Sequence, residues 1–362
     1  MEKLKIKKLN NFMLAERNGI SKGNGSIGNN FTKLVLGRNE KTILSIKNLK
    51  IWFPLEKTLL DKIFVKGKLR FVHAVDGVSL DICVGETLGL IGESGCGKST
   101  LGFSIIGLVK LKEGEINFYE KNISNLFKDR RRFISRHIQM VFQDPYSSLN
   151  PSMRVKEIIG RQFKIYGQKY TKKEIMDKIA SIVENVGLQK HDLEKFPHEF
   201  SGGQRQRISI ARALAPEPDL LIADEVTSAL DVSIQSQILA LLLKVKKNTN
   251  LSMIYITHDL RAARLITNNI AVMYLGKVIE YGETSELYSN PLHPYTKALL
   301  TAIPKSNYKN KIFLKGEIPS AVNPLSGCRL YGRCPLRMLI CKNNEPDLRY
   351  VSEKHYLACH LL

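Results

Sequence analysis

Apolar residues recur along this chain in two patterns that predict alternating strands and helices. Apolar and polar side chains alternate from Ile43 to Phe53, and shorter apolar runs recur further along. Such runs indicate strands, whereas apolar residues spaced three and four apart indicate helices. The expected strands cover residues 43–53, 78–82, 87–91, 114–118 (as an edge strand), 138–142, 220–224, 253–256, and the hairpin 270–274 with 277–280. The expected helices cover residues 101–108, 155–193, 204–214 and 232–247. This alternation is typical of an α/β domain.

One stretch departs from the alternation. Residues 144–151 are dense in turn formers, and helical spacing continues from Val155 to about Leu193 without an intervening strand. A small helical subdomain, at about residues 146–213, therefore interrupts the sheet.

Composition and net charge indicate where the protein is located and what kind of partner it has. Of 362 residues, 43% are hydrophobic, and no apolar run approaches the roughly 20 residues of a membrane span. The N-terminus offers lysines but no apolar signal region. We therefore expect a cytosolic chain whose association with a membrane is peripheral. The formal charge of +21 calls for a polyanionic neighbour, and nucleic acid, acidic lipid and nucleotide phosphates all qualify.

The most informative motif follows the apolar run 87–91 and fits the pattern G-x-x-x-x-G-K-[ST]. Its residues are Gly92, Glu93, Ser94, Gly95, Cys96, Gly97, Lys98, Ser99 and Thr100. Glycines in this pattern let backbone N–H groups turn inward at a helix N-terminus and cradle the phosphates of a nucleotide. Lys98 would reach the β- and γ-phosphates, and Ser99 would hold Mg²⁺.

A second anion-binding motif precedes the helix that contains Ile208. Ser201 is the expected N-cap, and Gly202 and Gly203 expose backbone N–H groups, with Gln204 following. The chain thus carries two predicted phosphate sites.

Polar side chains follow three of the expected strands. Gln143 follows strand 138–142, Asp224 and Glu225 end strand 220–224, and His258 follows strand 253–256. Ligand-contacting side chains gather at the carboxyl ends of α/β sheets. Two carboxylates there are expected for Mg²⁺ organisation and water activation, and the histidine for contact with the γ-phosphate.

An aromatic ring before the phosphate loop is expected to stack on adenine. Trp52 and Phe71 are both candidates, and Phe71 is the preferred one, although an aromatic residue at a strand end often packs in the core instead.

Taken in order, these motifs resemble the nucleotide-binding domain of an ATP-binding cassette (ABC) transporter, from about residue 43 to 281. The resemblance implies a P-loop NTPase core of RecA-like α/β fold, an antiparallel β subdomain and a helical signature subdomain. It also implies three segments: a flexible basic extension (1–42), the cassette (43–289) and a C-terminal region (290–362).

Further stretches resemble the ATPase subunits of oligopeptide and dipeptide importers. These are Phe142–Pro151, Phe200 before the signature, Asn290–Thr296 and Gly316–Ser320. The excursion between Trp52 and Phe71 is similar to that of the second of the two ATPases in such importers. The implied function is ATP hydrolysis at the cytoplasmic face of the membrane to energise peptide uptake. The alternatives are a related importer for nickel or other small solutes, an antimicrobial-peptide resistance system, and a cassette ATPase acting on nucleic acid or ribosomes.

The resemblance also implies roles for the site residues. Glu225 would be the general base, and Ser99, Gln143 and Asp224 would organise Mg²⁺. Lys98 and His258 would stabilise phosphate charge. The signature residues 201–204 would complete the ATP site of an identical or paralogous subunit in a head-to-tail dimer, and Asp231 belongs to the same site. The implied partners are that subunit, two membrane permeases and an extracytoplasmic solute-binding protein, without nucleic acid.

Four cysteines cluster near the C-terminus with the spacing C-x5-C-x6-C-x17-C. They are Cys328, Cys334, Cys341 and Cys359. This spacing matches neither the short pairs of most zinc sites nor the ferredoxin run. The resemblance to peptide importer ATPases implies that they hold a [4Fe-4S] cluster, while zinc and free thiols are the alternatives.

Overall fold

The structure is a computed structural model that describes residues 41–55, 70–124, 134–166, 170–228, 230–303, 312–324 and 326–362. The expected N-terminal extension lies outside the described residues except for its last two positions. Residues 56–69, most of the excursion between Trp52 and Phe71, lie outside them as well.

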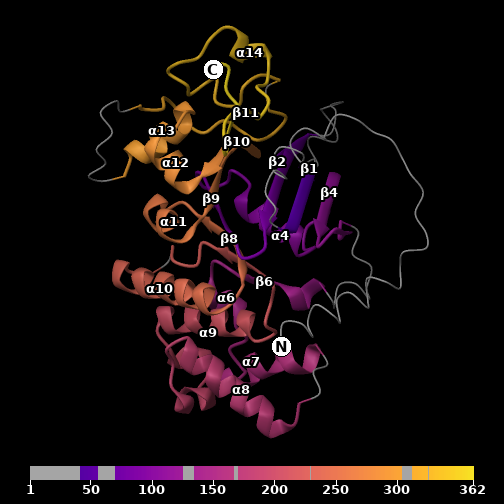
Figure 1. Ribbon diagram of the computed structural model, residues 1–362, viewed down its shortest axis with the longest axis vertical. Coiled ribbons are helices and arrows are strands. Elements are labelled where there is room, and N and C mark those ends of the chain that lie inside the picture. Colours follow the sequence, from indigo (N-terminus) through magenta and orange to yellow (C-terminus); the bar gives the residue numbers. More distant parts are fainter. Residues whose placement is uncertain are drawn as a thin grey trace, which may run out of the picture. The chain divides into compact units, whose positions relative to one another are not determined.

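A small antiparallel sheet contains the first strands of the chain (Figure 1). Its strands, in spatial order, are β2 (Phe71–Cys83), β1 (Thr42–Pro54), β4 (Glu113–Phe118) and β5 (Lys121–Asn122). The sequence predicted β4 as an edge strand, but the two-residue β5 pairs with its outer side. So short a strand carries no periodicity from which it could be predicted.

The second sheet has eight strands and supports the predicted site. Its strands, in spatial order, are β11 (Arg349–Ser352), β12 (His355–Leu357), β10 (Lys277–Glu283), β9 (Asn269–Tyr274), β3 (Thr87–Ile91), β8 (Ser252–Thr257), β7 (Leu220–Asp224) and β6 (Ile138–Val141). Strands β9, β3, β8, β7 and β6 run parallel. Their carboxyl ends therefore meet at one edge of the sheet. The predicted hairpin around Leu275 and Gly276 is confirmed by the antiparallel pairing of β9 with β10.

Helices connect the strands. They are α4 (Lys98–Ile105), α6 (Pro145–Ser148), α7 (Val155–Ile165), α8 (Lys172–Asn185), α9 (Gly202–Leu214), α10 (Val232–Asn248), α11 (Leu260–Ile266), α12 (Thr284–Ser289), α13 (Pro294–Thr301) and α14 (Ile340–Asn343), with 3-10 turns at Lys190–Glu194 and Pro197–Glu199. Helices α6 to α10 form the lower part of Figure 1, whereas α12, α13 and α14 lie in its upper part.

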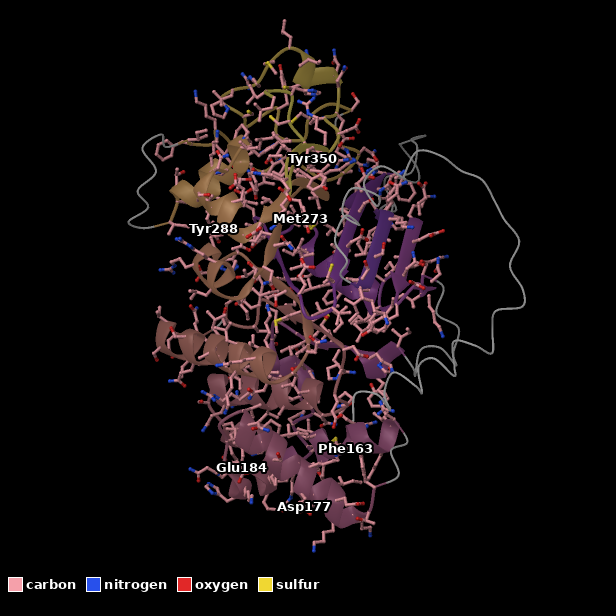
Figure 2. All side chains as sticks on the ribbon, in the orientation of Figure 1. Phe163, Asp177, Glu184, Met273, Tyr288 and Tyr350 are labelled. Atoms are coloured by element: carbon pink, nitrogen blue, oxygen red, sulfur yellow. The ribbon has the colours of Figure 1, made fainter. Side chains whose placement is uncertain are left out.

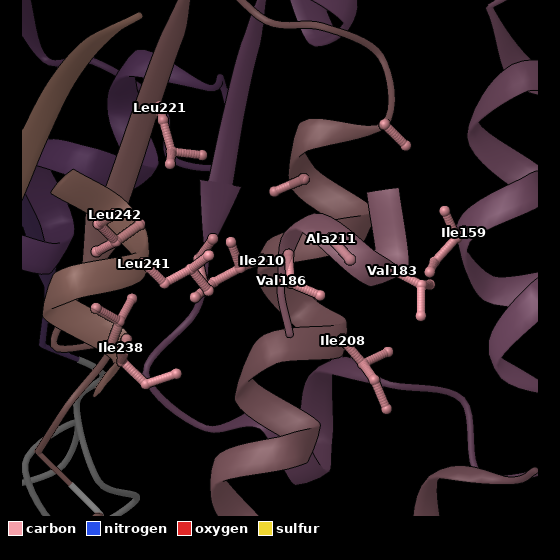
Figure 3. Close-up of a cluster of buried hydrophobic side chains, with 14 of the residues drawn as sticks. Ile159, Val183, Val186, Ile208, Ile210, Ala211, Leu221, Ile238, Leu241 and Leu242 are labelled. Carbon is pink, nitrogen blue, oxygen red and sulfur yellow. The ribbon is translucent and has the colours of Figure 1, made fainter. Parts of the chain in front are cut away.

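The helical insertion shares its hydrophobic core with the sheet. Figure 3 shows Ile159 on α7 and Val183 on α8 in one cluster with Ile210 on α9 and Leu221 on β7. Leu242 on α10 belongs to the same cluster and is fully buried. The apolar contacts are therefore continuous from α7 and α8 through α9 to the strand that carries Asp224.

The C-terminal region completes the larger sheet. Strand β12 pairs with β10, and β11 pairs with β12. Glu280 on β10 is fully buried and lies 2.8 Å from Nε2 of the buried His355 on β12. The same carboxylate accepts hydrogen bonds from the backbone N–H groups of Leu292 and His293. A buried carboxylate needs such partners, so Glu280 joins three C-terminal segments.

The buried His293 makes the stability of this region sensitive to acid. Its Nδ1 accepts a hydrogen bond from Tyr295 N–H and caps α13. Burial lowers the pKa of His293 from 6.5 to about 4. The His293 side chain is therefore neutral in the folded chain. Its contribution to stability is complete above pH 6.5 and is lost as the pH falls towards 4.

Between pH 7 and pH 5, we expect the titration of His293 to lower the free energy of unfolding by about 2 kcal/mol. Thermal melts at the two pH values measure the loss. A His293→Asn variant keeps a capping side chain that does not titrate, so it should lose less stability over this range. Equal losses in the variant and the wild-type chain would contradict the assignment.

Candidate active site

The phosphate loop connects β3 to α4, and its backbone requires glycine. Gly97 has φ +107° and Gly92 has φ +154°, both in the region that side chains other than glycine rarely adopt. A Cβ atom on Gly97 would lie 2.0 Å from the carbonyl oxygen of Ala74. A Cβ atom on Gly92 would lie 2.2 Å from the carbonyl oxygen of Met273, a β9 residue labelled in Figure 2. The loop is therefore wedged between β2 and β9.

Lys98 begins α4 and points back into this loop. Its Nζ donates hydrogen bonds to the carbonyl oxygens of Gly92 (2.8 Å) and Glu93 (3.0 Å). The side chain is buried. The structure thus places the ammonium inside the predicted phosphate cradle, where its charge would compensate that of a polyphosphate.

Ser99 and Asp224 form the predicted magnesium pair. Ser99 Oγ donates a hydrogen bond to Asp224 Oδ1 across 3.0 Å, although the two residues are 125 positions apart in the chain. Burial raises the pKa of Asp224 to about 6, with the neighbouring Glu225 adding to the rise, while Ser99 and Lys98 oppose it. A buried carboxylate of raised pKa is stabilised by a cation, and hydroxyl and carboxylate oxygens are ligands that suit Mg²⁺.

Glu225 lies between two further predicted site residues. Gln143 Nε2 donates a hydrogen bond to Glu225 Oε2 across 3.0 Å, and His258 Nδ1 lies 3.4 Å from Glu225 Oε1. Gln143, Glu225 and His258 follow β6, β7 and β8, whose parallel ends bring them together. Glu225 has φ +44°, an uncommon backbone conformation for a residue other than glycine. Strained residues of this kind concentrate at functional sites.

The signature residues cap α9. Ser201 Oγ accepts from Gln204 N–H, and Gln204 Oε1 accepts from Ser201 N–H (3.0 Å). Ser201 and Gln204 are exposed, whereas Gly203 is buried against Ile234. Helix α9 packs against α6, α7 and β6, while α4 packs against β2 and β7. The signature and the phosphate loop thus belong to different parts of the domain.

Asp231 caps the next helix, α10. Its Oδ1 accepts hydrogen bonds from Ile234 N–H (3.0 Å) and from Ser233 Oγ (2.8 Å). These bonds lower the pKa of Asp231, which is exposed. The structure explains this residue as a helix cap, and its contribution to nucleotide binding stays a prediction.

Two arginines that were not predicted from the sequence connect α6 with the signature helix. Helix α6 follows Gln143 directly, and its exposed Tyr146 lies under the guanidinium of Arg205 on α9, 4.0 Å from the ring centre. Arg212, also on α9, donates to the carbonyl oxygen of Ser148. The signal was available in the sequence, because arginines that recur within an apolar helix need partners.

The aromatic residues before the phosphate loop form a different arrangement from the expected one. Trp52 stacks on His73, with ring centres 4.0 Å apart and an angle of 16° between the planes. Phe71, the preferred candidate, is tilted against Trp52 at 6.2 Å. His73 was missed because a lone histidine on a strand carries no distinguishing pattern. Whether Phe71 contacts adenine stays a prediction.

Comparisons with known proteins agree with this geometry. The ABC transporter family matches residues 75–228, and the oligopeptide/dipeptide transporter C-terminal region matches residues 279–341. The chain is 46% identical to the oligopeptide transport ATP-binding protein AppF of Bacillus subtilis, over 89% of this chain and 98% of that protein. It is 44% identical to the oligopeptide transport ATP-binding protein OppF of Escherichia coli, over 88% of this chain and 96% of that protein.

The chain belongs to the ATP-binding subunits of ABC transporters, in the oligopeptide and dipeptide transporter group. Among solved structures it is similar to the ATP-binding cassette MJ0796 in a post-hydrolysis state with ADP and phosphate. The TM-score is 0.59 at 27% identity, over 67% of this chain and 99% of that one. A second similar structure, cbiO1 of Clostridium perfringens, has a TM-score of 0.58 at 30% identity over 69% of this chain and 92% of that one.

This membership confirms the predicted ABC cassette fold and the ATPase activity. As an ABC ATPase, the chain uses ATP and Mg²⁺. Among the described residues, none of the helices combines the length with the hydropathy that a membrane-spanning segment requires.

The prediction that the C-terminal cysteines of this ABC subunit hold an iron–sulfur cluster is wrong. The four C-terminal cysteines line one small pocket. Within the described ranges, however, no group of three or more His, Cys, Asp or Glu side chains is arranged to hold a metal ion. The same finding gives no support to the zinc alternative among these residues. Burial raises the pKa of Cys328 to about 11 and also raises that of Cys334 and Cys359.

Proposed function

We propose that this chain hydrolyses ATP to power the import of dipeptides and oligopeptides through a membrane permease. The observation that carries the proposal is the gathering of Gln143, Glu225 and His258 at the ends of adjacent parallel strands, with Asp224 bonded to Ser99 of the phosphate loop. The peptide cargo is inferred from relatives named as oligopeptide and dipeptide transport ATP-binding proteins.

Phosphoryl transfer to water depends on positioning and on neutralisation of charge. Lys98 and the N–H groups of its loop bind the phosphates. Ser99 and Asp224 are the residues that would hold Mg²⁺, which neutralises phosphate charge when bound. Glu225 accepts the proton of the attacking water, and Gln143 fixes the carboxylate through their 3.0 Å hydrogen bond. His258 stabilises the charge that develops on the γ-phosphate.

The signature residues would act in a second subunit. Ser201 and Gln204 are exposed at the N-terminus of α9, where helix N–H groups favour phosphate. We infer a head-to-tail dimer with an identical or paralogous ATPase, in which each subunit supplies the signature for the ATP held by the other. Hydrolysis then requires closure of the dimer.

The permease would contact the helical part of the chain near Tyr146. This ring is 65% exposed, and α6 is attached to α9 by Arg205 and Arg212. A permease segment bound there would be coupled to both Gln143 and the signature helix. We place the assembled complex at the cytoplasmic face of the membrane, with a solute-binding protein delivering cargo on the other side.

Transport in proteoliposomes tests the proposal. The chain is reconstituted with the permeases, second ATPase and binding protein of a peptide importer from the same source, and uptake of a labelled tripeptide is measured with and without internal ATP. ATP-dependent uptake that a Glu225→Gln chain abolishes is the expected result. Uptake of nickel without peptide would assign the chain to a related importer. ATPase stimulation by RNA, with no response to the permeases, would overturn the proposal.

A further inference from the structure

Glu93, the second residue of the phosphate loop, is held at each of its polar groups. Its N–H donates to the hydroxyl oxygen of Tyr295 (2.8 Å), and its carbonyl oxygen accepts from Lys98 Nζ (3.0 Å). Its carboxylate accepts two hydrogen bonds from Arg333, at 2.7 and 3.1 Å. Tyr295 and Arg333 lie 202 and 240 positions further along the chain. The phosphate loop is therefore fastened to the C-terminal region.

The groups that hold Glu93 are themselves fixed. Tyr295 is fully buried, and its ring lies 4.8 Å from that of Tyr274 on β9. The guanidinium of Arg333 lies over the Tyr274 ring, at 5.8 Å from its centre, and the arginine side chain is only 10% exposed. Two parallel bonds to one carboxylate fix direction as well as distance. This arrangement restricts the positions that Glu93 can take.

A second C-terminal arginine reaches the aromatic stack before the loop. Arg329 forms an ion pair with Asp76 on β2 and donates to the carbonyl oxygen of Leu275 (2.9 Å). Asp76 in turn accepts a hydrogen bond from Trp52 Nε1 (3.1 Å) and lies 3.1 Å from Nδ1 of His73. Asp76 thus connects Arg329 to both rings of the Trp52 and His73 stack.

The stack lies beside the phosphate loop. Ala74, next to His73, has the carbonyl oxygen that a Cβ on Gly97 would meet at 2.0 Å. Gly276, next to Leu275, donates its N–H to the carbonyl oxygen of Cys96 (2.9 Å). Arg329 and Arg333 therefore hold neighbouring parts of the predicted ATP site.

We propose that the C-terminal region positions the ATP site, with Arg333 and Tyr295 fixing the phosphate loop through Glu93 and Arg329 fixing the aromatic stack through Asp76. Tyr295, Arg329 and Arg333 are called the anchor residues below. The inference rests on ATP binding by this chain and not on its cargo. A failure of peptide transport would leave it intact.

The anchor residues should affect binding more than chemistry. The phosphate loop contacts the nucleotide in both the ground state and the transition state, so loosening it weakens both equally. Such a change raises KM and leaves kcat nearly unchanged. A general loss of folded protein would instead lower the apparent kcat.

Equilibrium binding of ATP and ADP to the purified full-length chain tests the role of Arg333. Arg333→Gln should raise both dissociation constants roughly 5- to 10-fold, in the range of typical couplings between sites, with kcat changed less than about 2-fold. Arg333→Lys keeps the charge and should recover part of the affinity. The matched control is Arg337→Gln, since Arg337 is exposed in the same region and lies over Tyr331.

A double-mutant cycle keeps the test decisive if Arg333→Gln unfolds the C-terminal region. Glu93→Gln removes the same ion pair from the side of the loop, and it should raise the dissociation constants as Arg333→Gln does. The double variant should bind no more than about 2-fold more weakly than either single variant, because the two residues act as one pair. Wild-type affinity in Glu93→Gln, or affinity in Arg333→Gln equal to that of Arg337→Gln, would overturn the proposal.

Inorganic triphosphate distinguishes the role of Arg333 from that of Arg329, because it carries the phosphates of ATP without the adenine base. Displacement of a fluorescent ATP analogue measures its affinity. Arg333→Gln should weaken both ATP and triphosphate, whereas Arg329→Gln should weaken ATP at least 3-fold and leave triphosphate unchanged. Equal weakening of both ligands by Arg329→Gln would refute the assignment of Arg329 to the base side of the site.

Discussion

Replacing Glu225 with glutamine is expected to lower steady-state ATP hydrolysis by a factor of about 10² to 10⁴, the usual contribution of a general base. Glutamine has nearly the same shape and can still bond Gln143, so ATP binding should persist. It cannot accept the proton of the attacking water. Phosphate release measures turnover, and equilibrium binding measures ATP affinity on the same preparation.

The control for this variant is Glu184→Gln, an exposed position on α8 in the helical part of the molecule (Figure 2). It should hydrolyse ATP like the wild-type chain. Because the Glu225→Gln variant would hold ATP without consuming it, we also expect it to accumulate as a dimer with Mg-ATP in size-exclusion chromatography. Near-normal hydrolysis would remove Glu225 from the role of base, and a strictly monomeric variant would contradict the inferred dimer.

Replacing Gly97 with alanine is expected to abolish ATP binding at the concentrations where the wild-type chain is saturated. The new Cβ atom would lie 2.0 Å from the Ala74 carbonyl oxygen, a backbone atom that cannot rotate away. The loop must therefore shift. A displacement of about 1 Å in an active site can lower activity on the order of 100-fold. Fluorescent ATP titration measures the loss, and circular dichroism checks the fold.

Gly95 supplies a matched control within the same loop. It also has a positive φ, of +78°, but a Cβ atom there would meet nothing within 4 Å. Gly95→Ala should carry only the backbone penalty of about 1 to 2 kcal/mol, spread over folding and binding. If Gly97→Ala bound ATP as tightly as Gly95→Ala does, steric contact with β2 would not be what the glycine avoids.

Local signals allowed the cassette to be predicted from the sequence. The phosphate loop, the signature and the strand that ends at Asp224 each occupy a few consecutive residues. The parallel sheet then brings Gln143, Glu225 and His258 together without any further long-range information, because parallel strands end at one edge.

Contacts of long sequence separation could not be predicted in this way. Nothing near Arg333 indicates that its partner is Glu93, 240 positions earlier. His73 has no pattern of its own, and its role is visible only beside Trp52. The iron–sulfur prediction failed for another reason, because it came from the resemblance to a family, and within the described ranges no group of three or more His, Cys, Asp or Glu side chains is arranged to hold a metal ion.

The pairing of β12 with β10 has a consequence for biosynthesis. Strand β10 ends at Glu283, yet the strand that covers its outer side begins only at His355, after α12, α13 and α14. Because a chain is synthesised from its N-terminal side, β10 emerges before the segment that pairs with it, and its outer edge stays open in the meantime. Until β12 arrives, the emerging polypeptide presents an unpaired strand that a chaperone would be suited to protect.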